Sequence, residues 1–387
     1  MPPQPPHRFT VLDSWRGICA CMVALFHFHA YNHFYDIPFF LNAGLYVDFF
    51  FVLSGFVIFI NYFDRLKEGY SLTTFMRLRF GRLYPLHLFT LLAFVAVELI
   101  QILIPPLAKL SQTPPLTGAG ATPDYIVTNL FMLHALGFGE RLSFNSPSWS
   151  ISAEFWTYLI FALTVLLFKG RALWGVLGLI VLSLGFLMFY GEFMTTVNFG
   201  IIRCIYGFGT GALCCLVWRR TKDLLPEKIK SARMWNLLET AAVISVLLFV
   251  SLAKETACVY AAPFVFFMTI YIFTHEKGII SKLLLHRFFV LLGTLSYSIY
   301  MTHAFIAGKV FILGGRIVGK ITDIDAFMTI NGKERLATNI WMGDALTLLY
   351  LAVVIAISIL TYKYIEEPGR KYFRRTTPAT KPLPASA

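Results

Sequence analysis

Arg16 and His27 share the first apolar segment of the chain, and their spacing is typical of paired functional residues. At about 100° per residue, eleven positions of an α-helix return to within roughly 20° of the starting face, so both side chains face the same interior. The helix rises about 16 Å over that interval, which places Arg16 near one membrane face and His27 deeper on the same stripe. Ionisable side chains in hydrocarbon are costly and mark functional sites. His29 is expected to point about 200° away from His27.

A layer of polar side chains is expected in the outer half of the membrane, at the depth of His27. An imidazole beside a carboxylate can take a proton from a hydroxyl nucleophile, so we assign His27 as the general base, with Asp48 or Glu154 orienting it. Within NSPSWSISAEFWTYL, Ser150, Glu154 and Tyr158 recur every fourth residue and share one helix face. The further candidates, for holding an acceptor or stabilising an oxyanion, are Ser150, Tyr158, Arg203, Ser296, Tyr297, Tyr300 and His303.

A second layer, on the cytoplasmic side, is rich in arginine, whose planar fork suits phosphate oxygens. Its members are Arg16, Arg77, Arg79, Arg82, Tyr84 and Glu366. Cytoplasmic positive charge alone is the alternative explanation of this cluster. Two chemically distinct layers imply two ligands that approach from opposite sides.

The composition indicates the elements that must position these residues. The chain has 387 residues, of which 57% are hydrophobic and 14% charged, and this balance predicts an all-α, polytopic membrane helix bundle. No metal is expected. The ten predicted membrane-spanning helices cover residues 11–31, 44–63, 82–104, 148–168, 173–190, 199–218, 237–253, 258–274, 288–313 and 342–365.

The net charge of +12 follows the predicted topology and does not indicate nucleic-acid binding. Most of the 33 Lys and Arg residues lie on one side if the N-terminus is cytoplasmic, and an even number of spans then puts both termini inside. We divide the chain into a disordered tail at 1–10, a transmembrane domain at 11–366 and a basic, proline-containing cytoplasmic tail at 367–387. The oligomeric state is left open.

Two long outer loops are expected, at 105–147 and 314–341. The first contains an apolar stretch at 125–136 that could lie in the interface or line a cleft, and the second is polar and contains glycine. Long loops on one face of a bundle often form lids or acceptor sites. The alternative is that these two loops only connect neighbouring helices.

The sequence resembles the membrane acyltransferase 3 family over nearly its whole length. Singly the motifs are weak, but their order and spacing are specific. Ser14 and Trp15 depart from the family's usual small and aliphatic pair, which affects local packing and not the chemistry. The motifs are LDSWRGICACMVALFH, GLYVDFFFVLSGFVI, FMRLRFGRLYPLH, NSPSWSISAEFWTY, Arg203 with Phe208 and Gly211, LGTLSYSIYMTH and YIEEPGRKYF.

The resemblance implies transfer of an acyl group, usually acetyl from cytoplasmic acetyl-CoA, to a hydroxyl of an extracytoplasmic glycan or lipid-linked sugar. The family's essential Arg and His correspond to Arg16 and His27, and the arginine layer would bind the acyl-CoA phosphates. We expect an O-acetyltransferase of the bacterial inner membrane that modifies a cell-envelope polysaccharide, by direct transfer or through an acyl-His intermediate.

Two interpretations from other classes remain open. Intramembrane Asp, Glu and His also serve proton relays, so a proton-coupled transporter or flippase of a lipid-linked saccharide is the first. The absence of an inverted repeat or matched broken helices speaks against it. A non-catalytic sensor of a lipid-linked sugar is the second, and acyl transfer by the purified protein separates the enzyme from both.

Overall fold

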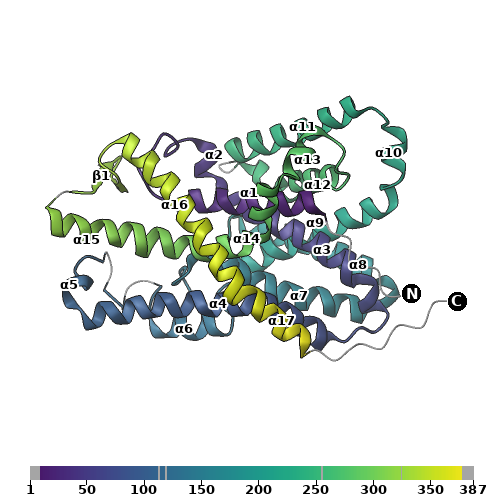
Figure 1. Cartoon of the computed structure of the whole chain (residues 1–387). Coiled ribbons are helices and arrows are strands. Elements are labelled where there is room, and N and C mark those ends of the chain that lie inside the picture. The colour runs from purple at the N-terminus through teal and green to yellow at the C-terminus, as the bar shows by residue number, and fades with distance from the viewer. Residues whose placement is uncertain (1–8, 112–113, 118–119, 254–255, 324, 377–387) are drawn as a thin grey trace.

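The protein is a bundle of α-helices with one small β-hairpin (Figure 1). The computed structural model describes residues 9–111, 114–117, 120–253, 256–323 and 325–376. The α-helices and strands are α1 (Thr10–Phe26), α2 (Pro38–Leu41), α3 (Tyr46–Lys67), α4 (Leu72–Leu103), α5 (Pro105–Ala108), α6 (Pro123–Leu130), α7 (Trp149–Phe168), α8 (Ala172–Tyr190), α9 (Gly200–Thr221), α10 (Leu224–Lys228), α11 (Ala232–Leu252), α12 (Ala262–Phe273), α13 (Ile279–Leu284), α14 (Arg287–Phe305), α15 (Leu313–Thr322), β1 (Phe327–Ile330), β2 (Lys333–Leu336), α16 (Ile340–Thr361) and α17 (Glu367–Arg375).

The bundle has the composition of a membrane protein, as predicted. Within the described part of the chain, six helical segments are long and apolar enough to cross a membrane, at 43–67, 72–103, 146–190, 200–221, 232–252 and 340–375. A helix covers most of each of the ten predicted apolar segments. Helix α1 has 17 residues and α12 has 12, which are too few to cross a 30 Å core even without tilt. The count of ten spans therefore stays a prediction.

Helix α3 lies at the centre of the bundle and is buried along most of its length. Its aromatic side chains Phe49, Phe56 and Phe59 are at most 1% exposed. It packs directly against α9, where a Cβ on Gly211 would lie 1.8 Å from the carbonyl oxygen of Val52. Small residues at helix interfaces permit such backbone contact in membranes. Gly211 therefore allows α3 and α9 to approach to direct backbone contact.

The first helix ends earlier than predicted, at Phe26, with His27 as its C-cap. The apolar residues that follow belong to a packed loop: Phe28 stacks on Tyr350 of α16 with ring centroids 4.1 Å apart. His29 consequently lies beyond the helix, and the predicted 200° rotation from His27 does not apply. The error arose because apolar loop residues buried by other elements have the composition of a continuing helix.

The predicted outer loop at 314–341 is largely structured. A π-helical turn (Ile306–Ile312) connects α14 to α15, and β1 pairs with β2 in antiparallel register. The two-residue turn Asn331–Gly332 has positive φ at both positions, +52° and +72°, which is the geometry that Asn-Gly favours between strands. Figure 1 shows α5, α15 and the hairpin at one end of the bundle and α10 and α17 at the other.

Residues of both predicted tails pack against the helix bundle. Phe9 is buried and Thr10 begins α1, while residues 1–8 lie outside the described part of the chain. Residues 367–375 form α17, which packs on α4 so closely that a Cβ on Gly81 would lie 2.3 Å from Cβ of Phe373. Residues 377–387 are likewise outside the described part.

Candidate active site

The site is built on the pairing of α1 with α14. The two helices touch through Gly17 and Gly293: a Cβ on Gly17 would lie 2.4 Å from the carbonyl carbon of Leu292, and one on Gly293 would lie 2.4 Å from the carbonyl oxygen of Asp13. The N-terminal half of α1 therefore meets residues 292–296 of α14. His27, at the far end of α1, meets His303 near the end of α14. The two helices run parallel and present their polar side chains in matching order.

Arg16 is held by α14 and lines a cavity between the helices. Its Nε donates to Oγ of Ser296 at 2.7 Å, and its Nη2 donates to the carbonyl oxygen of Gly293 at 3.1 Å. Asp13, one turn earlier, lies 3.5 Å from the same Nη2 atom. These contacts fix the guanidinium in one orientation at the cavity wall.

The cavity has a volume of about 80 Å³ and lies between α1, α3, α4, α7 and α14. It brings together residues from both layers that the sequence analysis kept apart. The predicted site residues that line it are Arg16, Arg82, Ser150, Glu154, Tyr158, Ser296, Tyr297 and Tyr300. The hydroxyl of Tyr300 lies 2.7 Å from Oγ of Ser150, and that of Tyr297 donates to the carbonyl oxygen of Leu83 at 2.5 Å.

Glu154 belongs to this cavity and not to His27. Its Oε1 accepts hydrogen bonds from Oγ of Ser54 at 2.5 Å and from the hydroxyl of Tyr158. The expectation that Glu154 orients His27 is therefore not met, because its carboxylate turns toward α3 instead. Ser54 is a cavity residue that the sequence analysis missed, although a single hydroxyl in the aromatic run of FVLSGFVI was the available signal.

The partner of His27 is a second imidazole. Nδ1 of His27 lies 2.9 Å from the carbonyl oxygen of Val23 and 3.2 Å from Nε2 of His303. Nδ1 of His303 lies 3.2 Å from the carbonyl oxygen of Ile299. Tyr300 connects this pair to the cavity, since its ring centroid is 5.8 Å from that of His303.

These contacts assign the tautomers. A carbonyl oxygen only accepts, so Nδ1 of His303 carries the proton and its Nε2 is an acceptor. Nδ1 of His27 then donates toward Val23 and His303, and the lone pair of His27 lies on Nε2. No described residue forms a hydrogen bond with that Nε2 atom. It is the atom available to take a proton from a hydroxyl.

Asp48 and Arg203 form a separate buried ion pair between α3 and α9. Nε of Arg203 donates to Oδ1 of Asp48 at 2.9 Å, and Nη2 donates to Oδ2 at 2.6 Å. The side chains are 0% and 1% exposed. The assignment of Asp48 as the orienting carboxylate is therefore wrong for this structure, because both of its oxygens are taken by Arg203. The same geometry removes Arg203 from the oxyanion candidates.

The remaining arginine-layer residues lie outside the cavity. Arg77 is exposed, Arg79 donates to the hydroxyl of Tyr62 at 2.9 Å, and Tyr84 stacks on Phe80. Glu366 is buried and accepts from Oγ of Ser298 at 2.7 Å. Of the arginines predicted as a group, Arg16 and Arg82 are thus the two that line the cavity. Among the described residues, no three His, Cys, Asp or Glu side chains are grouped to hold a metal ion.

A membrane helix bundle with an inter-helical cavity lined by two arginines, connected through Tyr300 to an imidazole whose Nε2 lone pair is available, has the parts of a membrane-embedded group-transfer enzyme. The family comparison agrees. The acyltransferase-domain model of the acyltransferase 3 family matches residues 9–363, so the chain belongs to that family and is a membrane acyltransferase.

Curated relatives cover the chain to different extents. Peptidoglycan O-acetyltransferase OatA of Listeria monocytogenes is 25% identical over 348 residues, 84% of this chain and 51% of the relative. Acyltransferase MdmB of Streptomyces mycarofaciens is 40% identical over 119 residues, 30% of this chain and 27% of the relative. Protein 2 in picA locus of Rhizobium radiobacter is 33% identical over 167 residues, 42% of this chain and 85% of the relative. No solved structure matches the chain.

Proposed function

We propose that the protein transfers an acetyl group from cytoplasmic acetyl-CoA to a hydroxyl of an extracytoplasmic glycan or lipid-linked sugar. The proposal includes a ten-span topology in a bacterial inner membrane with both termini in the cytoplasm. The similarity to a peptidoglycan O-acetyltransferase supports the acetyl donor and the saccharide acceptor. The concentration of Lys and Arg on one side of the predicted topology supports the orientation.

The donor is assigned to the arginine side of the cavity. Arg16 and Arg82 line it from α1 and α4, and both can bind phosphate oxygens through a planar fork. The pantetheine arm would extend along α1, over the roughly 16 Å between Arg16 and His27. The exposed Arg77 has no place in this assignment.

The chemical step is assigned to His27. Its Nε2 takes the proton of the acceptor hydroxyl as that oxygen attacks the thioester carbonyl carbon. A C–O bond forms, the C–S bond breaks, and the coenzyme A thiolate takes the proton back from Nε2, which leaves both products neutral at the reacting atoms. The hydroxyls of Ser296, Tyr297 and Tyr158 line the cavity, but each donates to a group of the protein: Gly293, Leu83 and Glu154, respectively. An oxyanion role for any of them would require the exchange of that hydrogen bond.

The observation that carries the proposal is the parallel α1–α14 pair, which holds the donor arginine at one level and the base at another. The test uses sealed vesicles of known orientation. Labelled acetyl-CoA added on the side of Arg82 should label a saccharide confined to the opposite side, without detergent. Vesicles that contain His27→Ala protein are the control. Labelling only when donor and acceptor share a compartment would contradict the proposal.

A further inference from the structure

A cleft of about 680 Å³ lies beside the end of α1 that carries His27. Phe26 and Phe28, the two neighbours of His27 in the chain, both line it. Its other walls are the loop that leads to α2 and the strand β2. The volume is in the range of small-molecule sites, which is about 300–1,000 Å³. The mechanism above uses none of its polar side chains.

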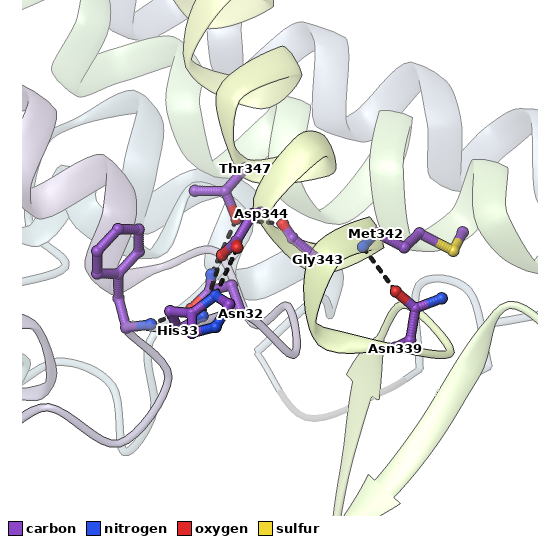
Figure 2. Close-up of polar contacts among 8 residues, drawn as sticks. Asn32, His33, Asn339, Met342, Gly343, Asp344 and Thr347 are labelled. Atoms are coloured by element: carbon purple, nitrogen blue, oxygen red, sulfur yellow. Dashed lines mark hydrogen bonds and ion pairs between the residues drawn. The ribbon is translucent and has the colours of Figure 1, made fainter.

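The walls of the cleft are held in place by hydrogen bonds from two sides. The backbone N–H of Leu336 in β2 donates to the carbonyl oxygen of His29, and the N–H of Tyr31 donates to the carbonyl oxygen of Leu336. Figure 2 shows the second attachment, in which Asn32 donates to Oγ1 of Thr347 at 2.8 Å. The loop therefore has a fixed shape between the hairpin and α16.

Two contacts of His33 with Asp344, drawn in Figure 2, and a close backbone approach at Gly343 tighten that attachment. Nδ1 and the backbone N–H of His33 lie 2.5 Å and 3.0 Å from the two carboxylate oxygens of Asp344. A Cβ on Gly343 would lie 1.6 Å from the carbonyl oxygen of Tyr31, so only glycine allows this approach. The cleft is a preformed site, which lowers the ordering cost of binding.

The charge of the cleft is positive. Lys333 and Arg335 line it, and the described residues give neither a carboxylate partner. The carboxylate of Glu334, which also lines the cleft, pairs with Arg316 at 2.5 Å. Arg335 stands over the ring of Tyr35 at 4.9 Å, which aligns the guanidinium with the aromatic wall. An anionic ligand fits this arrangement.

The remaining surface suits a sugar ring. Aromatic faces line the cleft from Phe34, Tyr35 and Phe40, and Phe34 keeps 42% of its surface exposed. Such rings offer apolar area at low entropic cost, and Asn42 and His29 add hydrogen-bonding groups.

We propose that this cleft binds the acceptor as an anionic saccharide, with its sugar ring on the aromatic wall and its carboxylate or phosphate at Lys333 and Arg335. The inference rests on the proposed function and names the substrate class for it. The hydroxyl to be acylated would be presented at the end of α1, where His27 lies between Phe26 and Phe28.

The test measures binding to the purified full-length protein by calorimetry, with two matched pairs of probes. Trigalacturonate is compared with its methyl ester, and maltotriose phosphate with maltotriose. We expect the anionic member of at least one pair to bind at least about tenfold more tightly, as loss of a charge-assisted hydrogen bond predicts. The pair that shows the preference identifies the anionic group.

The variant Lys333→Ala/Arg335→Ala should remove this preference, while Lys320→Ala, an exposed lysine on α15 outside the cleft, should keep it. Equal binding of both members of both pairs, or a preference that survives the double replacement, overturns the inference. Acetyl-CoA binding and acyl transfer are measured on the same preparations. If the wild-type protein does not transfer acetyl groups, the proposed function is contradicted. If it transfers them but does not prefer the anionic probes, this inference alone is contradicted.

Discussion

Nε2 of His303 lies 3.2 Å from Nδ1 of His27, and each ring uses Nδ1 to contact the carbonyl oxygen four residues earlier in its own helix. Both imidazole rings are thus held in place by a carbonyl oxygen of their own helix and by their contact with each other. The carbonyl oxygen of Val23 and Nε2 of His303 both face Nδ1 of His27, so His303 helps to orient the ring, a task that a carboxylate performs in many acid–base sites. The imidazole pair does this without placing a negative charge beside the base.

Replacement of His27 by alanine should abolish transfer and leave folding intact. The loss of a general base predicts a fall in turnover of at least about a hundredfold. The measurement is acetyl transfer by purified protein at saturating donor. His286→Asn is the control, because His286 is exposed and caps α14 through a side-chain acceptor that Asn also supplies. Wild-type turnover by His27→Ala would rule out the mechanism.

Replacement of His303 tests whether this residue positions His27. His303→Leu removes one of the two acceptors for Nδ1 of His27 and leaves the carbonyl oxygen of Val23, so the imidazole loses its contact with α14. Misplacement of a catalytic group predicts a fall in kcat of about a hundredfold. His303→Gln, whose side-chain oxygen can accept the same proton, should recover part of it. The KM for acetyl-CoA should not change in either variant. Equal kcat in the Leu and Gln variants would contradict a hydrogen-bonding role.

Arg16→Lys should weaken donor binding by at least about tenfold, because an ammonium cannot reproduce the guanidinium fork. The measurement is the affinity for acetyl-CoA by calorimetry. Arg77→Lys is the matched control, since Arg77 is exposed on α4 outside the cavity. Unchanged affinity in Arg16→Lys would reject the assignment of Arg16 to the donor.

The Asp48–Arg203 pair should stabilise the fold. Removal of one partner leaves a buried charge, so Asp48→Asn or Arg203→Met should cost about 3–5 kcal/mol of stability. The double variant Asp48→Leu/Arg203→Met should recover much of that loss, because an apolar pair carries no desolvation penalty. Thermal unfolding in detergent measures the effect. A well-folded double variant without activity would return Asp48 to the catalytic residues.

Gly343→Ala should displace the loop that follows His27, since its Cβ would overlap the carbonyl oxygen of Tyr31. The displaced loop forms a wall of the proposed acceptor cleft, so we expect kcat/KM for the acceptor to fall about tenfold. Donor affinity should remain as in the wild type. Gly314→Ala is the control, because no atom lies within 4 Å of the added Cβ. An unaffected acceptor reaction would show that the loop does not contribute to the site.

The sequence predicted the helices and the Arg16–His27 stripe because both depend on local periodicity. It could not predict that Asp48 contacts Arg203 and that His303 contacts His27, because depth along a helix does not determine which helices are neighbours. The end of α1 was misplaced because Phe28 is buried by α16, a contact between residues far apart in the chain. The hairpin was predictable in principle, since Asn331–Gly332 is a strong turn signal.

The glycine contact between Gly17 and Gly293 also limits how the enzyme can work. A transporter rocks one group of helices against another around a fixed substrate. Here Arg16 and His27, the residues proposed to bind the donor and to act as the base, lie on α1, whose backbone touches that of α14. A sliding motion of α1 along α14 would drive main-chain atoms into one another. The positions of α1 and α14 relative to each other are therefore fixed. On the proposed function, the acyl chain and the acceptor would therefore travel along this pair of helices while α1 and α14 keep their positions relative to each other.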